Sequence, residues 1–129
     1  MVQIKKVFVV DDDLEDQEIF SYTVKNLHAP VSCSFARDGT EAIEILKRNN
    51  DFKPDYIFID INMPRMNGVD LLKEIKLLNL APHSQLVIHS TNVSAITVAE
   101  CKRLGVNEFI VKSSSFNEMR NRLELLFNG

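Results

Sequence analysis

The sequence predicts an α/β fold, a doubly wound sheet of five parallel strands with five helices. Five short runs rich in β-branched and aromatic residues recur along the 129 residues, and stretches with helical spacing of apolar residues lie between and after them. Alternation of strand and helix is typical of a parallel sheet with helices on both faces. It fills the chain from residue 4 to residue 127, so we expect a single domain over residues 1–129.

The first two strand–helix units occupy the first part of the chain. Residues 7–10 (VFVV) form an apolar run followed by acids, and Asp13 is placed to cap the next helix or to lie in its first turn. Residues 31–36 (VSCSFA) form the second run. Asp38 followed three residues later by Glu41 is typical of a helix start, so a second helix follows directly.

The third unit begins with residues 56–59 (YIFI), an apolar run suited to a buried strand. Asn67 followed three residues later by Asp70 predicts the start of the next helix. The apolar residues that share one face of this helix are Leu71, Leu72, Ile75 and Leu78.

The last two units complete the pattern. Residues 86–89 (LVIH) and 108–111 (EFIV) are the fourth and fifth strands, and Gly105 closes the helix between them. Ser115 with Glu118 predicts the start of the fifth helix, and Asn128-Gly129 is typical of its stop. The apolar residues that share one face of this helix are Phe116, Met119, Leu123 and Leu126.

The composition excludes several functional classes. The net charge of −3 and the lack of any basic tract argue against direct binding of nucleic acid or of an anionic membrane. No secretory signal or membrane-spanning segment is visible, so we expect a cytoplasmic protein. Cys33 and Cys101 have no C-x-x-C spacing, which favours buried free thiols over a disulfide. His28, His83 and His89 show no metal-ligand spacing, which favours surface or packing roles.

Polar residues follow four of the five predicted strands. In an open parallel sheet, ligands bind beyond the carboxyl ends of the strands, so these residues should meet at one edge. Taken singly, each has a simpler explanation: Ser90 or Thr91 could cap the next helix, and Lys112 could be a solvated charge. In chain order these residues are Asp11, Asp12, Asp13, Asp60, Asn62, Ser90, Thr91 and Lys112.

Together, these residues predict a magnesium site. Two carboxylates 4 Å apart repel each other by about 4 kcal/mol at an effective dielectric constant of about 20, which a fold tolerates when a cation lies between them. Oxygen ligands favour Mg²⁺. A free oxygen of Asp60 beside the metal could then attack phosphorus in line, while the metal and Lys112 neutralise the phosphoryl oxygens. Pro64, in the segment after Asp60, stops further strand pairing there.

Four motifs in this order resemble the receiver domain of two-component response regulators, of the stand-alone single-domain type. They are VVDDD (9–13), FIDINMPRMNG (58–68), VIHST (87–91) and FIVK (109–112). The resemblance implies the flavodoxin-like receiver fold. It also implies that Asp60 accepts a phosphoryl group from the phosphohistidine of a histidine kinase or a phosphotransfer protein. Such a domain is a switch with self-phosphotransfer and autodephosphorylation activity rather than a turnover enzyme.

The resemblance also assigns the metal ligands. Asp12 would bind Mg²⁺ directly and Asp11 through water, beside Asp60 and the backbone carbonyl of Asn62. Ser90 would be the hydroxyl that moves to the phosphoryl group, and Lys112 would pair with that group.

Further positions would govern switching and the lifetime of the phosphorylated state. Asn62 and Asn92 match two positions that tune hydrolysis, and Thr91 is larger than the usual Ala or Gly and would restrict access to Asp60. Phe109 matches an aromatic switch, although simple packing explains it equally well. The output surface would be formed by the fourth helix, fifth strand and fifth helix, which would bind a downstream protein. A phosphorylation-dependent homodimer through this surface is left open.

One departure from the family concerns the bond after the lysine. Ser113 follows Lys112, where receivers typically carry a proline after a cis bond. A cis bond before a residue other than proline costs about 3–4 kcal/mol, so we expect either a trans bond with a reshaped loop or a strained exception.

Two other functional hypotheses remain. Asp11-x-Asp13 after the first strand resembles haloacid-dehalogenase-type phosphatases, in which Asp11 would be the nucleophile. Such enzymes need further acids after their lysine, whereas the segment SSSFNEM that follows Lys112 contains Glu118 as its one acid. The chain could also be a receiver-like module that binds partners without being phosphorylated.

Overall fold

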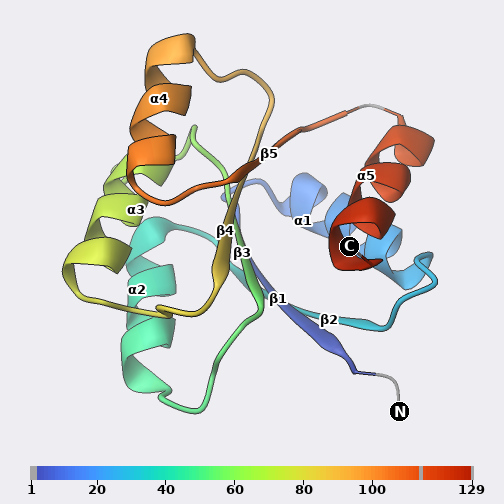
Figure 1. Cartoon of the computed structure of the whole chain (residues 1–129), viewed down its shortest axis with the longest axis horizontal. Helices are drawn as coiled ribbons and strands as arrows, with labels where there is room; N and C mark the ends of the chain where they lie inside the picture. The colour runs from blue at the N-terminus through green and yellow to red at the C-terminus, as the bar shows by residue number, and fades with distance from the viewer. Residues whose placement is uncertain (1–2, 114, 129) are drawn as a thin grey trace.

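The computed structural model describes residues 3–113 and 115–128, and residue 129 of the predicted helix stop lies outside this range. Within it, strands and helices alternate along the whole chain (Figure 1). The elements are β1 (Lys5–Val10), α1 (Leu14–Lys25), β2 (Val31–Ala36), α2 (Gly39–Arg48), β3 (Tyr56–Ile59), α3 (Gly68–Leu77), β4 (Gln85–Ser90), α4 (Ala95–Arg103), β5 (Glu108–Val111) and α5 (Phe116–Asn128). The predicted alternation is confirmed.

The strands form one parallel sheet in the order β2-β1-β3-β4-β5. Val10 is level with Ile59, and Ile59 is level with Ile88, so the carboxyl ends of the three central strands lie side by side. The strand order reverses at β1, where the chain leaves for β2 on one side and β3 on the other. Residues that follow β1, β3, β4 and β5 therefore reach the same edge of the sheet.

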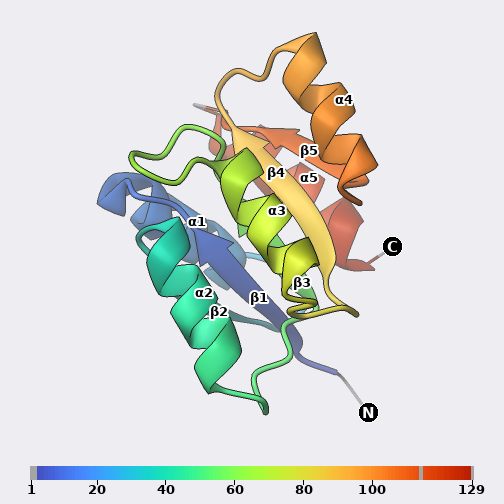
Figure 2. The ribbon, with the colours of Figure 1, turned by 90° about the vertical axis from the view of Figure 1, so that its left-hand side faces the viewer.

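Helices cover both faces of the sheet, as Figures 1 and 2 show. We call the helices on one face the α2–α3–α4 layer and those on the other the α1–α5 layer. Side chains alternate between the layers along each strand. Thus Phe8 and Ile57 pack against the α2–α3–α4 layer, whereas Val7 and Phe58 pack against the α1–α5 layer.

The helix starts are set by local side-chain bonds. Asp13 accepts hydrogen bonds from the backbone at the start of α1, and Asp38 does so for α2. Asn67 and Asp70 form the predicted capping box of α3. Ser94 caps α4, which excludes that role for Ser90 and Thr91.

The ends of α4 and α5 also follow the prediction. The backbone N–H of Glu118 donates to Ser115 Oγ at 3.3 Å at the start of α5. Gly105, with φ of +97°, ends α4 in a conformation that glycine adopts without steric cost.

Two residues of the predicted helix faces lie elsewhere. Leu78 is 40% exposed because α3 ends before it and Leu78 forms the C-cap. Phe116 is 39% exposed at the first position of α5, and Phe127 is buried in the α1–α5 layer instead. Both errors occur at helix ends, where the apolar spacing no longer fixes which side faces the sheet.

Both cysteines are free thiols, as predicted. Cys101 is buried, but Cys33 is half-buried because it lies on the edge strand β2. His28 and His83 are exposed, whereas His89 packs in the core between Phe20 and Phe58, and our prediction of surface or packing roles fits all three. Among the described residues, we find no helix with the length and apolar character needed to span a membrane.

Candidate functional site

Four strands deliver polar side chains to the carboxyl edge of the sheet. Asp11 directly follows β1, Asp60 follows β3 and Lys112 follows β5, while Ser90 is the last residue of β4. The parallel topology predicts this convergence, and the structure shows it. The residues of β1, β3 and β4 that lead to this edge are buried, so the core of the sheet fixes the positions of Asp11, Asp60 and Ser90.

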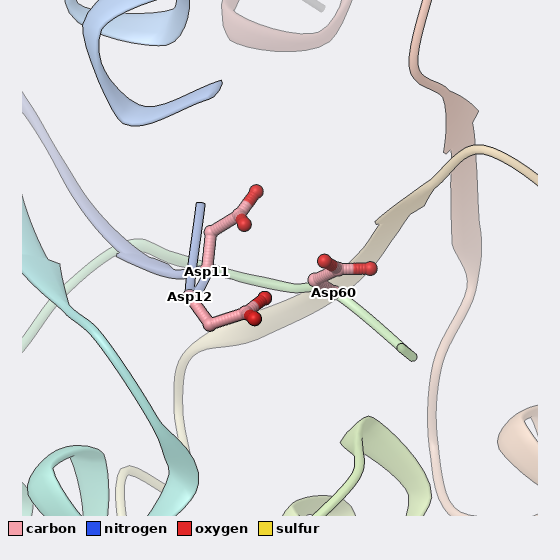
Figure 3. A group of neighbouring side chains, drawn as sticks. All are labelled: Asp11, Asp12 and Asp60. Carbon is pink, nitrogen blue, oxygen red and sulfur yellow. The ribbon is translucent and has the colours of Figure 1, made fainter. Parts of the chain in front are cut away.

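Three carboxylates form a group that could hold a metal ion. Asp11, Asp12 and Asp60 each offer an oxygen, and these oxygens lie within 4.8 Å of one another. Figure 3 shows the three side chains at the ends of the two strands, with the Asp12 carboxylate pointing toward Asp60. Asp11 and Asp60 are buried, whereas Asp12 is exposed. An all-oxygen donor set that is open on one side fits Mg²⁺, which keeps several water ligands.

The burial of Asp11 has an electrostatic consequence. Burial raises the pKa of this carboxyl, and hydrogen bonds from Lys112 and from the backbone N–H of Asp13 act in the opposite direction without cancelling it. The negative charge of Asp60 raises the pKa of Asp11 further. A cation among these oxygens would relieve this repulsion, which is the chemical reason that the group suits a metal.

Lys112 lies at the centre of the acids. Its Nζ is 2.9 Å from Asp11 Oδ2, 2.8 Å from Asp16 Oδ2 and 3.1 Å from Asp60 Oδ2. Burial alone would lower the pKa of Lys112, but the hydrogen bonds to Asp16 and Asp11 and the charges of Asp11 and Asp60 raise it overall. The alternative of a solvated charge is wrong, because the side chain is 14% exposed. The bond to Ser113 is trans, as are all peptide bonds among the described residues.

Both oxygens of Asp60 have donors. Ser90 Oγ donates to Oδ1 at 3.1 Å, and the backbone N–H of Asn62 donates to the same oxygen at 3.2 Å. Lys112 donates to Oδ2. The Asn62 amide also lies 3.5 Å from Ser90 Oγ. The phosphoacceptor candidate is therefore oriented by three other residues before any ligand binds.

The loop between β3 and α3 is held close to Asp60 by Gly68. The backbone N–H of Gly68 donates to the carbonyl of Ile61 at 3.0 Å. A Cβ atom at position 68 would lie 2.5 Å from the carbonyl oxygen of Asp60 and 2.8 Å from Ile61 Cα. Because both are backbone atoms, no side-chain movement could relieve the contact, and glycine is required for this close approach.

Asp16 belongs to this cluster and was not predicted from the sequence. It lies in the first turn of α1 and its side chain is 29% exposed. The sequence contains a weak signal, since α1 begins directly after the acids of β1 and its first turn must lie near the same edge. Nothing local to Asp16 indicates that it contacts a lysine 96 residues later.

The remaining predicted residues lie around the site. Thr91 and Asn92 are exposed on the loop after β4. Phe109 is half-buried against the α2–α3–α4 layer, and its carbonyl accepts a hydrogen bond from Arg122 at 3.1 Å. Glu118 accepts a hydrogen bond from Ser113 Oγ at 2.8 Å and is not part of the group that could hold a metal.

Comparisons with known proteins support one family. The sequence pattern of the response regulator receiver domain matches residues 7–124. The chain is 31% identical over 121 residues to chemotaxis protein CheY1 of Helicobacter pylori, covering 94% of this chain and 95% of that protein. It is 30% identical over 108 residues to chemotaxis protein CheY of Thermotoga maritima, covering 84% of this chain and 85% of that protein.

Among solved structures, a cyanobacterial phytochrome response regulator, RcpA in its phosphorylated form, superimposes with a TM-score of 0.82. It is 28% identical, and the match covers 96% of this chain and 91% of that one. The parallel fold, the acids at the carboxyl edge of the sheet and the range matched by the family all fit a receiver domain. The chain belongs to the response regulator receiver domain family of two-component signalling proteins.

Proposed function

We propose that the chain is a phosphorylatable signalling switch in which Asp60 accepts a phosphoryl group from a phosphohistidine in the presence of Mg²⁺. One observation carries this proposal. The Asp60 carboxylate belongs to the group of acids that could hold a metal and is also bonded by Ser90 and Lys112. Phosphoryl transfer requires a nucleophile, a metal and a second cation at one point.

The transfer would exchange one bond to phosphorus for another. An Asp60 oxygen attacks phosphorus in line, and the bond from phosphorus to the donor imidazole nitrogen breaks. The nitrogen retains the electron pair of that bond. Lys112, already 3.1 Å from Asp60, would neutralise charge on the transferred oxygens, and Ser90 would donate a hydrogen bond to one of them.

The metal would be held by Asp11, Asp12 and Asp60, together with the backbone carbonyl of Asn62. Bound Mg²⁺ would neutralise the phosphoryl oxygens and hold the acceptor and the phosphoryl group together. The three side chains fit the ion because their oxygens already lie within 4.8 Å of one another. Asp12 is exposed and leaves room for water ligands.

The phosphoryl group would act through the charge that it adds. About two negative charges at neutral pH would attract Ser90 and Lys112. We expect this movement to bias the face formed by α4, β5 and α5, with Phe109 changing its packing. A downstream protein would bind that face, and a phosphorylation-dependent homodimer could use it as well. Asn62, Thr91 and Asn92 would tune the lifetime of the phosphorylated state.

Related proteins support this assignment. The RcpA structure is of a phosphorylated response regulator, and the matched family is that of response regulator receiver domains. We therefore expect a histidine kinase or a phosphotransfer protein as the donor. The free thiols Cys33 and Cys101 suit a reducing compartment, which supports placement in the cytoplasm.

Mass spectrometry after incubation with acetyl phosphate and Mg²⁺ tests the proposal. We expect a mass increase of one phosphoryl group, which maps to Asp60 and is absent without the metal. Asp60→Asn should abolish labelling, whereas Asp51→Asn, at an exposed position on a loop, should leave it unchanged. Full labelling of Asp60→Asn would contradict the assignment.

Two further measurements, phosphomonoester hydrolysis and Mg²⁺ binding, distinguish the two alternatives. Sustained hydrolysis of a phosphomonoester that is blocked by Asp11→Asn would support a phosphatase. The position of Glu118, which bonds Ser113 outside the acidic group, argues against that reading. No Mg²⁺ binding at millimolar concentration would support a module that acts by binding alone.

A further inference from the structure

Among the described residues, Lys112 has one charged partner outside the group that could hold a metal. Asp11 and Asp60 belong to that group, whereas Asp16, at 2.8 Å, does not. An ammonium group has three hydrogens, so the three carboxylates account for its full donor capacity. Asp16 therefore occupies Lys112 without contributing an oxygen to the metal site.

The backbone of Asp16 is held by the N-terminal cap of α1. It lies in the first turn of α1, where its backbone N–H donates to the capping residue Asp13 at 3.4 Å. Lys112 lies beyond the end of β5, on the loop that leads to α5. A residue held by a capped helix can determine where a long, flexible side chain lies.

On the side of Lys112 that faces the α1–α5 layer, Asp16 is the one anion among the described residues that line the adjoining cavity. A small cavity of about 40 Å³ lies there. His89 is neutral at pH 7, since burial first and the charge of Lys112 second lower its pKa to about 4. Asp16 is thus the one carboxylate in the lining of this cavity. The residues that line it are Asp16, Ile19, His89, Lys112, Ser113 and Met119.

We propose that Asp16 is a positioning residue that holds the Lys112 ammonium on the α1 side, so that a divalent ion can take the oxygens of Asp11 and Asp60. The proposal rests on the proposed Mg²⁺-dependent function. The ion and the ammonium compete for the same two carboxylates. With Asp16 present, Lys112 keeps a charge-assisted hydrogen bond when the ion enters. Without it, the ammonium depends entirely on the two carboxylates that the ion needs.

Mg²⁺ binding to the unphosphorylated protein, measured by calorimetry or NMR titration, tests this proposal. Asp16→Asn keeps the shape of the side chain and removes its charge. We expect the Kd for Mg²⁺ to rise about five-fold, a coupling typical of residues in one charged network. Asp16→Glu retains the charge and should stay within about two-fold of the wild type.

Glu15→Gln is the matched control. It removes one negative charge from the same turn of α1, at an exposed side chain with no contact to Lys112. The change in Kd for Mg²⁺ that Glu15→Gln causes measures the effect of losing any negative charge near the site. Salt screens this long-range interaction. We expect its Kd for Mg²⁺ to change by less than about two-fold.

A double substitution separates action through Lys112 from a direct effect. In a Lys112→Met background, Asp16→Asn should change the Kd for Mg²⁺ no more than Glu15→Gln does. Equal effects of Asp16→Asn and Glu15→Gln in the wild-type background would overturn the proposal. So would an undiminished Asp16→Asn effect in Lys112→Met. Both outcomes leave the proposed function standing, whereas absence of Mg²⁺ binding by the wild type would overturn both.

Discussion

The two helical layers cover the same sheet with different chemistry. The α2–α3–α4 layer is mainly aliphatic, with Leu71 and Leu72 fully buried against Ile57. The α1–α5 layer holds more aromatic rings, and the ring centroids of Phe20 and Phe58 lie 5.0 Å apart with edge-to-face geometry. This second layer also encloses a titratable side chain, His89.

The same contrast continues at the site. On the side of the α2–α3–α4 layer, the backbone of Asp60 is positioned by shape, since the loop after it closes through a glycine that lies against its carbonyl. On the side of the α1–α5 layer, Lys112 is positioned by charge, through Asp16. The backbone of Asp60 and the ammonium group of Lys112 are therefore held by different forces, although Lys112 also bonds the Asp60 carboxylate. Each should therefore respond to a different perturbation.

The largest expected effect tests the aromatic contacts of the α1–α5 layer. Phe20→Ala should lower the free energy of unfolding by about 4 kcal/mol, because a fully buried ring that contacts Phe58 and His89 is replaced by a cavity. Leu71→Ala in the other layer should cost about 3 kcal/mol. Urea denaturation measures both. A loss below about 1 kcal/mol for Phe20→Ala would show that the ring contacts are not what stabilises this layer.

The next effect concerns positioning by shape. Gly68→Ala should cost about 3 kcal/mol and reduce labelling of Asp60 by acetyl phosphate, because the added Cβ meets backbone atoms of Asp60 and Ile61. Gly39→Ala is the control. Its Cβ would meet Met66 Sδ at 2.6 Å, the flexible end of a side chain that can move. A Gly68→Ala protein with wild-type stability and labelling would refute the steric argument.

The smallest of the three effects tests the response of the α1–α5 layer to protons. Burial lowers the pKa of His89 to about 4 in the folded state, whereas the unfolded value is about 6.5. Between these values the unfolded chain binds a proton that the folded chain does not. His89 should therefore lower the free energy of unfolding by about 2 kcal/mol between pH 7 and pH 5.

His89→Leu should remove this contribution, so that its free energy of unfolding falls less than that of the wild type over the same range. Leu71→Ala, which changes no titratable group, should keep the wild-type slope. Urea denaturation at both pH values measures the difference. Equal slopes for His89→Leu and the wild type would show that His89 does not distinguish the two layers in this way.

Local features of the sequence predicted most of the fold. The apolar runs located all the strands with an error of two residues or less at their ends. In the central strands β1, β3 and β4, burial on both faces requires continuous apolar residues. The caps at Asp38 and Asn67 were also confirmed, since each bond spans three residues. The caps considered at Ser90 and Thr91 were wrong because β4 and its loop extend further and Ser94 takes the role.

The site was predictable where topology alone decides it. Residues that follow parallel strands must reach one edge of the sheet. The sequence alone therefore predicts that Asp60 and Lys112 lie close together, and the two side chains are hydrogen-bonded. Asp16 could not be expected there, because its contact depends on how α1 leans against the loop after β5. The same holds for Gly68, whose role follows from a backbone approach of a few ångströms.

By itself, the sequence determined the alternation of strands and helices, the family and the edge at which the acids gather. These features depend on the spacing of apolar residues, on short sequence motifs and on hydrogen bonds between residues close in the chain. The tertiary structure alone decided which carboxylates surround Lys112, and that His89 is buried without a charge. Those outcomes depend on the packing of segments distant in the chain, where a shift of an ångström or two makes or breaks a hydrogen bond.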